Sequence, residues 1–147
     1  MVNETLLALH LLAAFATVTS IVMFVAVLVG ARRAQATTDA LAVMRLSNVA
    51  AMLWNVGGIT VLIFGVWLAL DADQYDILDG WIIAAIVLWV VASAAGGPLT
   101  RGYRDALGTG GEAALATVRS QRTAILHAVM AIATLALLVV MIYKPGA

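Results

Sequence analysis

The sequence predicts an all-α polytopic membrane protein, a bundle of four transmembrane helices. Of its residues, 64% are hydrophobic and only 11% are charged, whereas about a quarter of the residues of a soluble domain are charged. Four long stretches carry no charge, and a helix of about 20 apolar residues crosses a bilayer core about 30 Å thick. The 147 residues leave room for one domain only, so residues 1–147 form a single transmembrane unit.

The four spans are expected at about residues 5–30, 46–70, 80–98 and 122–143. The first run is longer than the apolar part of a signal peptide, and Glu4 stands where such peptides carry positive charge, so we interpret it as an uncleaved helix. Gly96-Gly97-Pro98 is expected to end the third span, because proline cannot continue the helical hydrogen-bond pattern. The fourth span lies between Arg122 and Lys144.

Two of the helices are expected to begin before they reach the membrane. Thr38 and Asp39 are typical N-cap residues for the second helix. Thr109 and Glu112 have the spacing of a capping box, which predicts a helix that begins near Glu112 and runs unbroken into the fourth span.

Charge is sorted between the connections and predicts the orientation. The first and third connections carry all seven arginines, whereas the second has four acidic residues and no basic one: Asp71, Asp73, Asp76 and Asp79. By the positive-inside rule the arginine-bearing connections are cytoplasmic, so the N-terminus and C-terminus are outside, as expected of a bacterial inner-membrane protein. The arginines are expected to contact membrane lipids and no nucleic acid, because no aromatic residues are interleaved with them.

His127 is the strongest candidate for a functional site, because ionisable side chains are costly within a membrane. It lies about five residues inside the fourth span, at a depth where the second helix offers Met52 and Asn55; Met130 is one turn further along. Histidine with methionine can ligate haem b, and also suits copper. Two alternatives stay open: a structural hydrogen bond to Asn55 or to a backbone carbonyl, and a proton or ion relay.

His10 enters the first span from the opposite side of the membrane. The two histidines are therefore expected to differ in depth by roughly 10–20 Å, which is too far for one metal ion. His10 could form a second cofactor or metal site, line a pocket for haem or a quinone, or extend its ring toward the outer interface.

Small residues predict which helices pack together. Gly57, Gly58 and Gly65 lie in the second span, and Ala13 and Thr17 form a small-xxx-small pair in the first. Such residues let helix backbones approach closely. We expect the first and second spans to pack on each other, with a ligand cleft beside the glycines as the alternative.

The chain resembles a bacterial family of small four-span integral membrane proteins of unknown function. The resemblance depends on His10, on Gly96-Gly97-Pro98 followed by Arg101, on His127 and on Lys144-Pro145-Gly146. That family is similar in outline to copper-resistance protein D and to membrane protoporphyrinogen oxidase-like proteins. It implies a four-helix bundle in the inner membrane, and haem or copper at His10 and His127.

Three functional hypotheses follow. The leading one is a membrane protein, expected to be an oligomer, that binds haem or a metal in a redox or cofactor-handling role. The second is a non-enzymatic subunit that forms a homo-oligomer or assembles with a partner membrane protein. The third is a small transporter, which is disfavoured because no carboxylate lies within a span. No complete catalytic motif is present, and the lack of cysteine excludes thiolate sites and disulfides.

Overall fold

The computed structural model describes residues 2–71 and 78–144, and these form an all-α protein. The six described helices are α1 (Val2–Arg33), α2 (Thr37–Met44), α3 (Leu46–Asp71), α4 (Gly80–Thr109), α5 (Gly111–Arg119) and α6 (Gln121–Tyr143). Four segments are long and apolar enough to cross a membrane: α1, α2 together with α3, α4, and α6. The predicted fold class is therefore confirmed.

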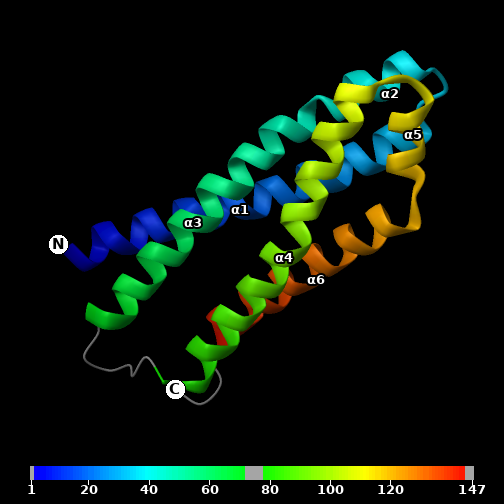
Figure 1. Cartoon of the computed structure of the whole chain (residues 1–147). Helices are drawn as coiled ribbons and strands as arrows, with labels where there is room; N and C mark the ends of the chain where they lie inside the picture. The colour runs from blue at the N-terminus through cyan, green and yellow to red at the C-terminus, as the bar shows by residue number, and fades with distance from the viewer. Residues whose placement is uncertain (1, 72–77, 145–147) are drawn as a thin grey trace.

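The helices form two hairpins. In the first hairpin α1 packs against α3, with α2 between them in the chain; in the second, α4 packs against α6, with α5 between them. Both chain termini lie at one end of the molecule, and α2 and α5 lie together at the other (Figure 1). We name the end that contains α2 and α5 the arginine end, because every arginine of the chain lies in or beside its helices.

The third long helix does not end at Pro98, so the predicted end is wrong. α4 continues to Thr109. Proline removes one backbone donor, but a membrane helix tolerates it where packing against neighbouring helices stabilises the segment. The residues beyond Pro98 also bury an apolar stripe, which includes Leu99, Tyr103 and Ala106.

The helix starts at the arginine end differ from the predicted ones. α2 begins at Thr37, and neither Thr38 nor Asp39 caps it. α5 begins at Gly111, without a capping box. The helix from Glu112 does not run unbroken into the membrane either, because Ser120 adopts an extended conformation, and its hydroxyl accepts from the Thr123 amide at 3.2 Å to begin α6.

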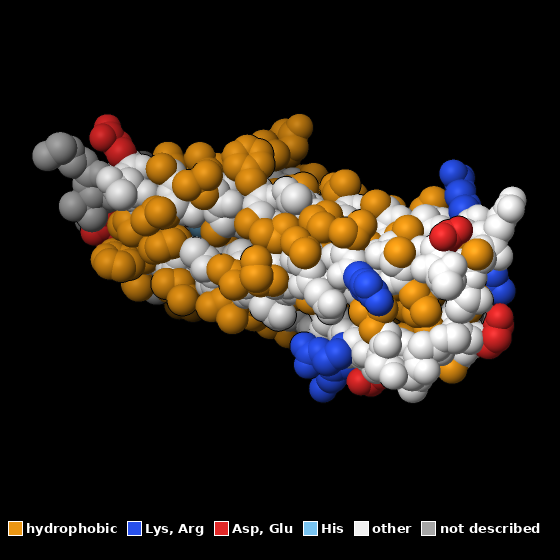
Figure 2. Space-filling model, turned by 90° about the horizontal axis from the view of Figure 1, so that it is seen from above, with side chains coloured by type: hydrophobic (Ala, Val, Ile, Leu, Met, Phe, Trp, Pro, Cys, Tyr) orange, Lys and Arg blue, Asp and Glu red, His pale blue; other side chains and the backbone are white. Residues whose placement is uncertain are grey.

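Apolar side chains cover much of the surface away from the arginine end (Figure 2). In water so large an apolar surface would cause aggregation. The exposed leucine, isoleucine and valine side chains therefore agree with a multi-pass membrane protein. In the acidic connection Asp73 and Asp76 lie outside the described residues, as do Pro145 and Gly146.

Candidate functional site

The predicted packing of the first and second spans is correct. A Cβ atom at Gly57 would lie 2.9 Å from Thr17 Oγ1 and 3.1 Å from the Ala13 carbonyl oxygen. These distances are too short for a methyl group, so only glycine permits this approach of α3 to α1. The Thr17 hydroxyl donates to the Ala13 carbonyl at 2.9 Å and leaves no polar group unpaired there.

His10 joins the same two helices nearer the chain termini. Its Nδ1 lies 3.0 Å from the Val61 carbonyl oxygen, so the ring donates from α1 to the backbone of α3. Gly65 makes room for the ring, since a Cβ atom there would lie 3.0 Å from His10 Cε1. The imidazole is half-buried between the helices and acts as a structural tie.

His127 lies where the two hairpins meet at the arginine end. It is 5% exposed, and its Nδ1 donates to the Thr123 carbonyl one turn back at 2.7 Å. This assigns the second ring nitrogen, Nε2, as the acceptor of the Tyr103 hydroxyl at 3.4 Å. The rings of Phe24 from α1 and Tyr103 from α4 lie nearly perpendicular to the imidazole, at centroid distances of 6.2 and 5.8 Å.

The neighbours predicted for His127 on the second span are wrong. Met52 and Asn55 both lie on the exposed side of α3, and Met52 is 60% exposed. Within the described residues the backbones of α3 and α6 do not pack against each other, so Met52 and Asn55 do not lie beside His127. Met130 is 1% exposed and lies on the buried side of α6 with His127. The error arose because residues at equal depth in the membrane were assumed to be neighbours. α6 packs on α4 and not on α3.

The surroundings of His127 do not fit a haem or a metal ion. Both ring nitrogens already have partners, and aromatic rings fill the space beside them. Within residues 2–71 and 78–144 no three His, Cys, Asp or Glu side chains lie close enough to share a metal ion. His10 and His127 lie on different hairpins and have different partners.

Sequence reasoning missed Tyr103 and Phe24. Tyr103 follows Pro98, where the third span is expected to end, so it was not considered as part of a helix. The spacing of the buried residues of α4 could have identified it, since Ala92, Ala95, Leu99, Tyr103 and Ala106 follow at intervals of three or four residues. That pattern continues straight through the proline.

Two tryptophans join α3 to α4 in the middle of the molecule. The Trp89 indole N–H donates to the Gly58 carbonyl at 3.0 Å. Trp54 lies on Gly96, where a Cβ atom would be 2.7 Å from its Nε1. Gly58 and Gly96 thus serve contacts between α3 and α4 within the fold.

Asn55 remains as a polar side chain inside a span that the fold does not use. It is exposed on α3, nine residues after Leu46, or about 14 Å along the helix axis. No described residue forms a hydrogen bond with its amide. An amide without a partner is costly in hydrocarbon, so the outward face of α3 has a polar group that the monomer leaves unsatisfied.

Comparison with protein-family models, with curated proteins and with solved structures found no match to this chain.

Proposed function

We propose that this protein is a non-enzymatic subunit of a bacterial inner-membrane assembly, with its arginine end in the cytoplasm and both termini outside. It associates with a second copy of itself through the outward face of α3. The exposed Asn55 amide, inside a membrane span and without a partner in the monomer, carries this proposal.

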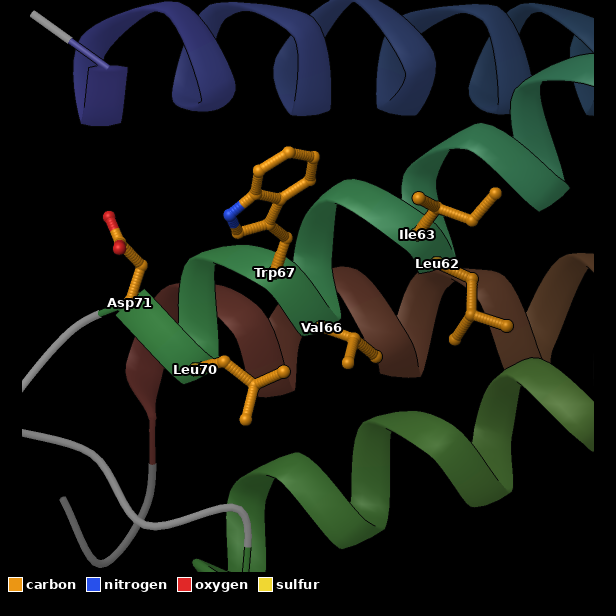
Figure 3. Close-up of a pocket in the computed structure, with 6 residues that line it drawn as sticks. All are labelled: Leu62, Ile63, Val66, Trp67, Leu70 and Asp71. Carbon is orange, nitrogen blue, oxygen red and sulfur yellow. The ribbon is translucent and has the colours of Figure 1, made fainter.

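The outward face of α3 has the shape of a helix-packing surface. Its exposed apolar side chains follow at alternating intervals of three and four residues: Val49, Met52, Val56, Ile59, Ile63, Val66 and Leu70. This is the spacing by which two helices interlock along a shared seam. Near the acidic connection a shallow hollow of about 620 Å³ lies along α3, lined by six residues of that helix alone (Figure 3).

A second copy fits this face because an asparagine amide can both donate and accept a hydrogen bond. In a two-fold symmetric dimer the same patch meets itself, so the two Asn55 side chains satisfy each other. The buried hydroxyls of Thr17, Ser20 and Thr134 give no competing site, since all three donate to backbone carbonyls of their own helices.

Cysteine cross-linking in native membranes tests the proposal, since the chain has no cysteine of its own. Val56 on α3 and Leu135 on α6 are each 62% exposed, so Val56→Cys and Leu135→Cys form a matched pair. We expect an oxidant to cross-link the first into dimers and not the second. Equal cross-linking of both variants would refute the α3 face.

The amide itself is tested in the Val56→Cys background. Asn55→Leu should lower the dimerisation constant about tenfold, because a hydrogen bond between membrane helices contributes about 1–2 kcal/mol. Thr19→Leu is the control, since Thr19 is an exposed polar residue on α1. If both changes leave cross-linking unaltered, the amide has no role in association.

The cofactor hypothesis has its own test. An absorption spectrum and elemental analysis of the purified protein, expressed with haem and copper supplied, would detect either group. The packing around His127 gives the expected result, which is no Soret band and no bound metal. A Soret band that His127→Ala removes would instead restore the redox or cofactor-handling role.

A further inference from the structure

A crevice opens between α4, α5 and α6 at the arginine end, separate from the α3 face. Its volume is about 620 Å³, and all three helices line it. Tyr103 lies among the lining residues and is itself 2% exposed. The break at Ser120 creates this space, since it turns α5 away from the line of α6.

The charged lining consists of two guanidinium groups and one carboxylate. Arg101 comes from α4, Arg122 from α6, and Asp105 lies one turn beyond Arg101. In the described part of the chain no carboxylate lies within ion-pair distance of either arginine. Two unpaired guanidinium groups that line the same crevice from different helices suit a phosphate, which accepts hydrogen bonds from such groups.

The crevice is apolar deeper in the membrane. Pro98 and Leu99 precede Arg101 by two or three residues, and Leu126 follows Arg122 by four, so each wall changes from charged to apolar within about one helical turn. A free phosphate uses only the charged part. A lipid uses both, because its phosphate lies at the interface and its acyl chain lies against the apolar wall.

We propose that this crevice binds the headgroup of a phosphate-bearing lipid that also carries an amine. Arg101 and Arg122 bind the phosphodiester, Asp105 binds the ammonium group, and an acyl chain packs along the half-buried Pro98 and Leu126. The site does not depend on α3 or on dimerisation.

Native mass spectrometry of the delipidated full-length protein tests the site, with phosphatidylethanolamine as the ligand. We expect the double variant Arg101→Gln/Arg122→Gln to weaken binding at least about tenfold, because each arginine supplies charged hydrogen bonds. Arg33→Gln/Arg45→Gln is the matched control, since it removes the same charge from exposed positions of the same end outside the crevice. Equal weakening by both pairs would overturn the site.

A second pair of variants keeps every charge: one member fills the crevice, and the other adds the same side chain outside it. A Cβ atom at Gly102, which lines the crevice, or at Gly108, which does not, would meet nothing within 4 Å. Both variants should therefore fold. Gly102→Leu should lose lipid binding, whereas Gly108→Leu should retain it, and binding by Gly102→Leu at the wild-type level would refute the site.

Two competitors test whether the bound phosphate belongs to a lipid and whether its headgroup carries an amine. They are inorganic phosphate and phosphatidylglycerol. We expect neither to displace phosphatidylethanolamine at equal concentration. Displacement by inorganic phosphate would overturn the lipid assignment. Asp105→Asn should abolish the preference over phosphatidylglycerol, and a preference that persists would refute the role of Asp105.

Discussion

The two hairpins are built differently. In the first, α3 approaches α1 so closely that the backbone of Gly57 lies against Thr17 and Ala13. In the second, no glycine of α4 has a side chain or backbone of α6 among its nearest atoms, and larger groups, including Tyr103 and His127, fill the space between the helices. The first hairpin therefore has backbones in contact, and the second has interlocking side chains.

The two histidines follow the same division. His10 donates from one helix of the first hairpin to the backbone of the other. His127 donates within its own helix and presents its ring to Phe24 of the first hairpin and Tyr103 of the second. Intramembrane histidines can thus serve as structural ties in two ways, by joining backbones or by completing a cluster of side chains.

The largest effect is expected from added volume in the first hairpin. Gly57→Leu must separate α1 from α3, and we expect it to lower the free energy of unfolding by more than about 3 kcal/mol. Gly102→Leu in the second hairpin meets open space, and should change that free energy by less than about 1 kcal/mol. Denaturation in mixed micelles, followed by circular dichroism, measures both. Similar losses for both variants would show that the contrast between the hairpins is wrong.

The next effect distinguishes the two histidines. His127→Ala should lower the free energy of unfolding by about 2–3 kcal/mol, because it leaves a cavity beside two stacked aromatic rings and removes the partner of the Tyr103 hydroxyl. His10→Ala should cost only about 1 kcal/mol, since this half-buried ring mainly loses one hydrogen bond. The same denaturation experiment compares the two variants. A larger loss for His10→Ala would show that His10, and not His127, is the more important structural residue.

Much of the fold could be predicted because the membrane limits the choices. The four spans followed from length and charge, and the pairing of the first two from Gly57 and Thr17. The error at Pro98 arose from a local rule, because the clash and the missing donor of a proline weaken a helix in isolation. Buried contacts made by Leu99 and Tyr103 outweigh that weakness, and only the tertiary structure contains them.

The candidate site was less predictable than the fold. The sequence identified His127 as an ionisable residue within a span, and the structure shows it buried. Sequence reasoning placed Asn55 and Met52 beside His127 by depth alone. Depth fixes one coordinate, whereas neighbours depend on how each helix is paired and rotated. The rotation of α3 could be predicted only in part: Gly57 and Gly65 mark the side that faces α1, whereas Gly58 faces Trp89 of α4 and Asn55 is exposed.

The smallest effect is expected where the hairpins join. Trp89→Phe keeps most of the ring but removes the indole donor to the Gly58 carbonyl, which should lower the free energy of unfolding by about 1 kcal/mol. The Gly58 carbonyl also belongs to the helical hydrogen bonding of α3, so it is not left without a partner, and this limits the loss. The change should appear equally in a Gly102→Leu background, because residues far apart act additively. A loss above about 3 kcal/mol would mean that this one bond, and not the Phe24, Tyr103 and His127 cluster, holds the hairpins together.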